Sequence, residues 1–129
     1  MAHATVEWTD NLEGAFELTA LLRLIADEMR LRSTGVFPVG GIRVRAIRLS
    51  DYVIADGAGP DDAFINIDVK MGVGRSEAFR KAFFDQLFAA VKDFLGDLFE
   101  RRPLALSMYV EEAEGWKHNS IHRRFGGQG

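Results

Sequence analysis

The sequence predicts an α+β fold in which two βαβ repeats form a four-stranded sheet with both helices on one face. Three observations favour this fold. Short runs with alternating apolar residues are typical of half-buried strands, and two longer segments carry apolar residues at helical spacing. These elements follow one another in the order β-α-β-β-α-β, so that each half of the chain is a strand, a helix and a strand. Right-handed crossovers should make each strand pair parallel and cover it with its helix, which leaves the other sheet face in need of cover.

The first repeat begins with a short, partly alternating strand at residues 2–8, which Thr9-Asp10-Asn11 ends with turn-forming residues. A helix is predicted over Leu18–Arg32, where six apolar residues recur at helical spacing: Leu18, Leu21, Leu22, Leu24, Ile25 and Met29. Residues 33–35 should end this helix, and 36–41 should form a loop. The second strand, Ile42–Leu49, interleaves apolar residues with arginines.

The second repeat follows a connection rich in Gly, Asp and Pro at residues 56–62. Ala63–Met71 alternates cleanly and predicts a third strand. A second helix should then run as far as Pro103, and residues 104–110 should form the fourth strand. The apolar stripe of this helix is predicted to be continuous and to comprise Phe84, Leu87, Phe88, Val91, Phe94, Leu95 and Leu98.

Length and composition limit the function classes. A chain of 129 residues favours one domain, here expected at 1–125 with a flexible tail at 126–129. The net charge of -3 gives no electrostatic reason to expect nucleic-acid binding. The absence of cysteine excludes disulfides and thiolate chemistry. No apolar run is long enough to cross a membrane, and no signal peptide is evident, so a cytoplasmic protein is expected.

The junction Gly72-Val73-Gly74-Arg75-Ser76 between the third strand and the second helix predicts an anion-binding site. Gly72 and Gly74 permit a tight turn and a close approach of the backbone to a ligand. The start of a helix favours an anion, and the guanidinium of Arg75 can bind a carboxylate with two hydrogen bonds. The alternative is a solvated arginine, but a cation at a helix N-terminus is unfavourable without an anion nearby. The dinucleotide and phosphate-loop patterns are both incomplete here, so a carboxylate is the better candidate.

Arg43 is the second candidate ligand for an anion. It follows the apolar, glycine-containing loop that begins with Val36 and Phe37, and this loop resembles the wall of a pocket. The alternative, a solvated row of arginines along an edge strand, is about equally favoured for Arg43, Arg45 and Arg48 by the general surface preference of arginine. No histidine or carboxylate pattern indicates a metal site, since the pair His118 and His122 has no acidic partner and is typical of an exposed C-terminal segment.

Taken in order, several segments resemble the 5-carboxymethyl-2-hydroxymuconate isomerase family of the tautomerase superfamily. The resemblance extends over nearly the whole chain and depends on the order and spacing of its segments: the first strand ending in Asp10-Asn11, Thr34-Gly35-Val36-Phe37-Pro38 through Arg45, Ala55-Asp56-Gly57, Gly72 to Ser76, Arg102-Pro103-Leu104-Ala105-Leu106-Ser107, and Trp116-Lys117-His118-Asn119-Ser120-Ile121-His122.

The resemblance implies a homotrimer and a cofactor-free isomerase of homoprotocatechuate catabolism, acting on an unsaturated 2-hydroxy dicarboxylate or tricarboxylate. Arg43 and Arg75 match positions expected to bind substrate carboxylates and to stabilise the developing dienolate. Phe37 and Gly74 are expected to line the same substrate site. No metal or other cofactor is implied.

One position departs from the pattern of the family, whose base is an N-terminal proline, because Ala2 stands there in this chain. If Met1 is removed, the primary α-amine of Ala2 can act as the base, with a pKa lowered by burial and by the neighbouring arginines. If Met1 is retained, the amine is displaced by one residue. Two functions therefore remain open: an isomerase that uses Ala2, and a family member that binds a small carboxylate without turnover. A third reading is an interaction domain without a ligand.

Overall fold

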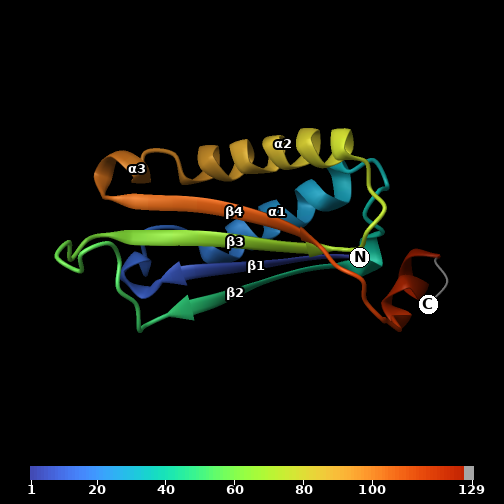
Figure 1. Ribbon diagram of the computed structural model, residues 1–129, viewed down its shortest axis with the longest axis horizontal. Helices are drawn as coiled ribbons and strands as arrows, with labels where there is room; N and C mark the ends of the chain where they lie inside the picture. The colour runs from blue at the N-terminus through green and yellow to red at the C-terminus, as the bar shows by residue number, and fades with distance from the viewer. Residues whose placement is uncertain (127–129) are drawn as a thin grey trace.

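A computed structural model, shown in Figure 1, describes residues 1–126 of the chain. It contains the four expected strands and the two expected long helices: β1 (Ala2–Thr9), α1 (Leu18–Arg32), β2 (Ile42–Leu49), β3 (Ala63–Met71), α2 (Glu77–Leu95) and β4 (Leu104–Glu112). Three short 3-10 helices, η1 (Asp10–Leu12), η2 (Val39–Gly41) and η3 (Ser120–Phe125), and a one-turn helix, α3 (Leu98–Arg101), complete the described part. From residue 127 onward, the tail predicted at 126–129 lies outside the described residues.

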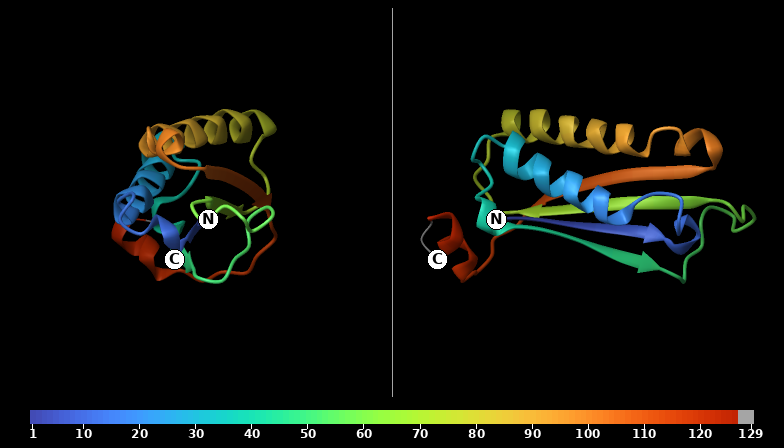
Figure 2. Two further views of the ribbon diagram at one scale, coloured as in Figure 1. Left: turned by 90° about the vertical axis from the view of Figure 1, so that its left-hand side faces the viewer. Right: turned by 180° about the vertical axis from the view of Figure 1, so that it is seen from behind.

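The strands form one mixed sheet in the order β2-β1-β3-β4. β1 and β2 are parallel, as are β3 and β4, and the two central strands β1 and β3 are antiparallel. Both long helices cover the same face of the sheet, which Figure 2 shows from behind. The two predicted βαβ repeats and the α+β class are confirmed.

The register of the strands brings three distant segments to one corner of the sheet. Ala2, the first residue of β1, pairs with Ile42 at the start of β2 and with Met71 at the end of β3. Arg43, the start of the chain and the turn after β3 are therefore neighbours. This corner is where the sequence-based candidates for a site converge.

The core lies between the sheet and the two helices, and alternation along β1 and β3 places every second residue in it. On β1 these residues are Ala2, Ala4, Val6 and Trp8, and on β3 they are Ala63, Ile65, Ile67, Val69 and Met71. The helices contribute Leu21, Ile25 and Met29 from α1 and Phe83, Phe84, Leu87, Val91 and Leu95 from α2.

The predicted second helix was wrong in two respects. Phe88 is only half-buried and Phe94 is 36% exposed, whereas Phe83, which the predicted stripe omits, is 5% exposed. The helix also does not continue to Pro103: α2 ends at Leu95 because Gly96 has φ 52°, a left-handed conformation that glycine adopts readily. Leu98 is buried, but on the separate turn α3.

The other face of the sheet is uncovered by helices and carries polar and charged side chains. A groove of about 840 Å³ lies on it, lined by residues of all four strands that include Thr5, Ile47, Asp68 and Tyr109. The side chains of Ile47 and Tyr109 are 48% and 67% exposed. Among residues 1–126, no helix is long and apolar enough to span a membrane.

The C-terminal segment folds back onto the corner at which the chain starts. Asn119, which is 7% exposed, donates a hydrogen bond of 2.8 Å from Nδ2 to the carbonyl oxygen of Gly40 in η2. Asn119 also caps η3, because its Oδ1 accepts a hydrogen bond from the amide of Ile121. His122 is half-buried against Gly40, so it differs from the exposed residue expected from the sequence, while His118 is exposed as expected.

Candidate active site

Arg75 is held in place by the two loops that meet beside it. The chain leaves β3 through Gly74, whose φ of 111° is a conformation that side chains other than glycine rarely adopt. Arg75 Nη1 donates to the carbonyl oxygen of Gly72 at 2.9 Å, and Nη2 donates to that of Val36 at 3.4 Å. The side chain is half-buried, and these contacts fix the direction in which its remaining donors point.

Phe37 supports Arg75 from the side of the core. The guanidinium lies 5.3 Å from the centroid of the Phe37 ring, which is a cation–π distance. The ring itself is 1% exposed and packs edge-on against Phe79 and Phe83 of α2. Phe37 was expected to bind substrate, and this stays a prediction; its ring is almost fully buried and lies against the guanidinium of Arg75.

Arg43 reaches the same corner from β2. It is half-buried, and its Nη1 donates to the carbonyl oxygen of Gly41 at 3.2 Å. Arg45 lies two residues further along the same face, whereas Arg48 lies on the opposite face, 5.8 Å above the Trp8 ring. The alternation predicted for these three arginines is confirmed.

Helix α2 begins after the turn, with Ser76 as its N-cap and Glu77 as its first residue. Ser76 Oγ already accepts a hydrogen bond from the amide of Phe79 at 3.1 Å. The helix N-terminus is thus capped from within the chain. Arg75, which precedes the cap, is the stronger candidate for binding an anion.

The start of the chain lies among these cations. Gly41 allows a close approach, because a side chain there would place Cβ only 3.2 Å from the Cα of Met1. The pKa of the Met1 α-amine is below its usual value, first because of burial and then because of the positive charges of Arg75, Lys117 and Arg43. An amine in this position loses its proton more readily than an exposed one. Ala2 is fully buried at the first pair of the sheet.

His3 and Arg45 form a second polar group beside Met1. Arg45 Nη1 lies 3.1 Å from His3 Nδ1, and His3 Nε2 lies 3.0 Å from Met1 Sδ. Arginine can only donate, so Nδ1 accepts and the proton of a neutral imidazole is on Nε2. Burial and the charges of Arg45 and Arg43 lower the pKa of His3, which agrees with a neutral ring.

Lys117 lies at the candidate site, although the sequence analysis gave it no role. It lies on the C-terminal segment, two residues before the anchor Asn119. A methyl group at Gly72 would lie 3.3 Å from Arg75 Nη1 and 3.8 Å from Lys117 Nζ. Lys117 and Trp116 also line a cavity of about 170 Å³ together with Met1 and Gly72. The only signal in the sequence was the resemblance of residues 116–122 to the family.

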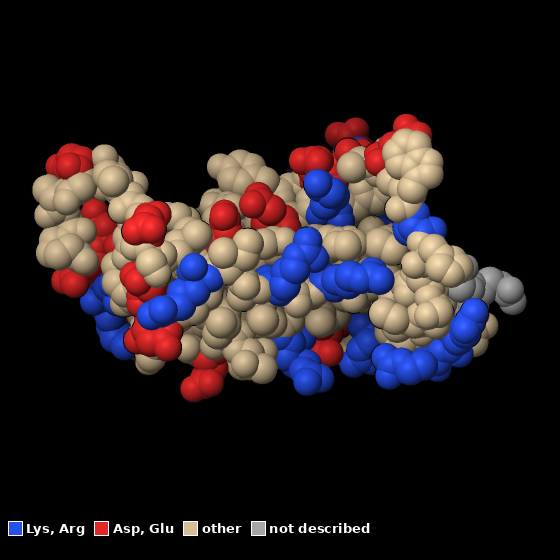
Figure 3. All heavy atoms as spheres, turned by 90° about the horizontal axis from the view of Figure 1, so that it is seen from below, with Lys and Arg blue, Asp and Glu red and all other residues tan. Residues whose placement is uncertain are grey.

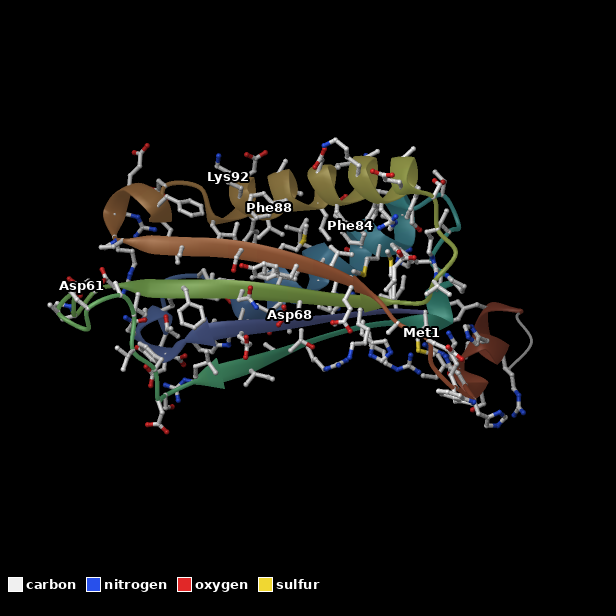
Figure 4. All side chains as sticks on the ribbon, in the orientation of Figure 1. Met1, Asp61, Asp68, Phe84, Phe88 and Lys92 are labelled. Atoms are coloured by element: carbon white, nitrogen blue, oxygen red, sulfur yellow. The ribbon has the colours of Figure 1, made fainter. Side chains whose placement is uncertain are left out.

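Positive charge accumulates at this corner, where Glu114 is the one acidic residue among those that line the cavity beside Met1. Within residues 1–126, Arg43, Arg75 and Lys117 form no ion pair with an acidic side chain. Figure 4 shows Met1 at the end of the sheet beside the C-terminal segment, with Asp61 at the opposite end. Figure 3 shows Lys and Arg side chains extending along one side of the molecule to the end where the C-terminal residues lie. An anion at the corner would offset the mutual repulsion of these cations.

The chemistry of this corner is that of an anion site with a basic amine beside it. Among the described residues, no group of three or more His, Asp or Glu side chains is placed to hold a metal ion. The candidate residues Ala2, Arg43, Gly74 and Arg75 come together here, with Phe37 beneath them.

Comparison with known proteins agrees with this geometry. A sequence model of the 5-carboxymethyl-2-hydroxymuconate isomerase family matches residues 2–125. The chain belongs to this family. The predicted resemblance to 5-carboxymethyl-2-hydroxymuconate isomerases is thereby confirmed. The 5-carboxymethyl-2-hydroxymuconate Delta-isomerase of Escherichia coli is 34% identical over 128 residues, which is 97% of this chain and 99% of the relative.

Two solved structures of 5-carboxymethyl-2-hydroxymuconate isomerases are similar over almost their full length. The first, from Deinococcus radiodurans R1, is 41% identical with a TM-score of 0.90 and covers 96% of this chain and 93% of its own. The second, a 5-carboxymethyl-2-hydroxymuconate delta-isomerase, is 30% identical with a TM-score of 0.87 and covers 100% of this chain and 95% of its own. The family and the fold therefore agree.

Proposed function

We propose that this member of the 5-carboxymethyl-2-hydroxymuconate isomerase family isomerises 5-carboxymethyl-2-hydroxymuconate or a closely related unsaturated 2-hydroxy polycarboxylate. One observation carries the proposal: the α-amine of Met1 has a lowered pKa and lies among Arg75, Lys117 and Arg43, none of which forms an ion pair with a carboxylate in residues 1–126. A polycarboxylate supplies the missing negative charge, and the amine supplies a base for proton transfer.

In the proposed reaction the neutral amine removes the proton from the 2-hydroxyl group of the enol. The O–H electrons form the C2 carbonyl, the double bond moves to C3–C4, and the protonated amine returns the proton to C5. One O–H bond is broken and one C–H bond is formed, so no other reactant is needed. Negative charge spreads over the dienolate between the two steps, and Arg43 and Arg75 are placed to stabilise it.

The base in this proposal is the α-amine of Ala2 after removal of Met1. The corner supports a low pKa for an amine, because burial and the neighbouring cations all disfavour the protonated form. Alanine lacks the ring that fixes the direction of a proline nitrogen. We therefore expect a functional base that is less well directed than proline would be.

The test combines two measurements on the purified protein. Intact-mass spectrometry determines whether Met1 is present, and ultraviolet absorbance follows the ketonisation of 2-hydroxymuconate and of its 5-carboxymethyl derivative. The expected result is a chain without Met1 that accelerates ketonisation above the buffer rate. A chain that starts at Ala2 and gives only the buffer rate with both substrates would refute the proposed activity.

A second candidate function is carboxylate binding without turnover. It is favoured by the presence of alanine at position 2, where the family has proline. In that case muconate binds but ketonisation does not exceed the buffer rate, and replacing Ala2 with proline restores it.

We also propose that the chain forms a homotrimer through the uncovered face of its sheet. Exposed Tyr109 and Ile47 and the groove between the strands support association there, and a neighbouring subunit would then lie close to His3 and Arg45. Sedimentation equilibrium should give three times the chain mass, and a monomer at micromolar concentration would contradict the proposal. A cytoplasmic location stays a prediction from the sequence.

A further inference from the structure

We propose that Lys117 and Arg75 together bind a single carboxylate of the substrate in the space above Gly72. This inference rests on the proposed function and assigns a specific role to the C-terminal segment. It places one carboxylate of the muconate chain beside the turn after β3, and leaves Arg43 on β2, on the other side of β1, for the rest of the substrate.

The geometry of Gly72 defines the place of this carboxylate. Arg75 Nη1 lies 3.3 Å and Lys117 Nζ 3.8 Å from the position that a Cβ of Gly72 would occupy. Both nitrogens therefore face the same small volume. A carboxylate whose oxygens accept charge-assisted hydrogen bonds of about 2.8 Å can contact both nitrogens there.

The proposed role explains why position 72 is a glycine: a side chain there would fill the space between Arg75 and Lys117, whereas the backbone conformation does not require glycine. The residues with positive φ include Gly74, but not Gly72, so the backbone at position 72 is accessible to any L-amino acid. An alanine would fit the conformation, but its methyl group would project between the two cations. The absence of a side chain keeps open the volume that the carboxylate needs.

Lys117 is available for this role and is held near it. Its side chain is exposed, and none of the carboxylates in residues 1–126 lies within ion-pairing distance of it. Asn119, two residues further on, is anchored by its hydrogen bond to Gly40. Lys70, which lines the same cavity, differs from Lys117 because it pairs with Glu111 at 3.8 Å.

The experiment measures binding of cis,cis-muconate, which has two carboxylates but no 2-hydroxyl group and cannot be ketonised. Titration calorimetry compares the wild type with Lys117→Gln, Lys117→Arg and Gly72→Ala. Lys92→Gln is the matched control, since Lys92 is an exposed lysine that projects from α2, away from Met1 (Figure 4). It removes the same charge from the chain without touching the corner.

We expect Lys117→Gln and Gly72→Ala each to weaken muconate binding by about five- to tenfold, and Lys117→Arg to preserve it. Lys92→Gln should remain within twofold of the wild type. The role is refuted if Lys117→Gln binds as tightly as the wild type, or if Lys92→Gln weakens binding as much. It is also refuted if Lys117→Arg is as weak as Lys117→Gln, since a carboxylate contact needs only the positive charge.

A pH profile separates direct binding from a merely structural role. The charge of Lys117 lowers the pKa of the Met1 α-amine, and we expect the same direction for the Ala2 amine at this corner. Lys117→Gln should therefore shift the rising limb of kcat/KM to higher pH, and Lys117→Arg should not. If the wild type ketonises its substrate, and Lys117→Gln has the muconate affinity and the pH profile of the wild type, this inference alone is refuted. A wild type that neither binds muconate nor ketonises its substrate refutes the proposed function.

Discussion

Replacing Gly40 with alanine should release the C-terminal segment from the corner of the sheet. The added Cβ would lie 2.7 Å from His122 Nδ1 and 3.0 Å from both the N and the Cα of His122. Rotation of the imidazole can relieve the first contact, but the other two are with backbone. Residues 119–125 must therefore move by several tenths of an ångström.

The magnitude follows from what that movement breaks. Asn119 donates to the carbonyl oxygen of Gly40 at 2.8 Å, and such a hydrogen bond contributes about 0.5–1.5 kcal/mol. Overpacking of this kind adds about 1–3 kcal/mol. The free energy that holds the segment in place should fall by at least about 1.5 kcal/mol, the sum of the two lower limits, so local opening should be accelerated roughly tenfold or more.

Hydrogen exchange of the amides in η3, read by mass spectrometry, measures that opening directly. Gly115→Ala is the matched control, because nothing lies within 4 Å of a Cβ at Gly115 and its φ does not require glycine. We expect Gly40→Ala to accelerate exchange in η3 and to lower kcat/KM, while the amides of β1 and β3 remain protected. Unchanged exchange in η3 would refute the idea that the contact with Gly40 holds the segment.

Three further predictions concern the corner and the core. Arg75→Ala should weaken muconate binding roughly 10- to 100-fold, because a hydrogen bond to a charged group contributes about 1.5–3 kcal/mol; calorimetry that shows less than a twofold change would contradict the placement of the site. The same variant should shift the rising limb of kcat/KM to higher pH, because the neutral amine is the base and Arg75 is the charge that lowers the pKa of the Met1 amine most; we expect the same direction for the Ala2 amine at this corner. A shift to lower pH in steady-state profiles would exclude the amine in this role. Leu87→Ala should cost about 2–5 kcal/mol of unfolding free energy at its fully buried position, whereas Phe94→Ala should cost less than about 1 kcal/mol; equal costs in urea denaturation would contradict the observed orientation of α2.

The strands and the first helix could be predicted because each is specified by its own residues. Period-two alternation in Ala63–Met71 predicts a strand with one buried face, and the structure places those residues in the core. The second helix was harder, because the six phenylalanines and four leucines or valines from Phe79 to Phe99 are compatible with more than one buried face of the helix. In the structure, the helix is oriented so that Phe83, and not Phe88, is buried and packs against the ring of Phe37.

Arg75 should also contribute to stability. It links two loops through the carbonyl oxygens of Gly72 and Val36, and its guanidinium lies 5.3 Å from the centroid of the Phe37 ring. Arg75→Ala should therefore reduce stability by about 1–2 kcal/mol in addition to weakening binding. Melting temperatures of Arg75→Ala and Arg75→Lys would separate the two contributions, since lysine keeps the charge but loses the planar stack.

Lys117 could not be assigned from the sequence because its position depends on a contact between residues far apart along the chain. Asn119 and Gly40 are separated by 79 positions, and no local pattern predicts such a hydrogen bond. This hydrogen bond holds the C-terminal segment, and Lys117 with it, near the start of β1 and the turn after β3. Arg43 lies on β2, and Arg75 is held by hydrogen bonds to the carbonyl oxygens of Gly72 and Val36. The lysine lies on a segment held by few contacts, so loss of the anchor should remove one carboxylate contact while the two arginines stay in place.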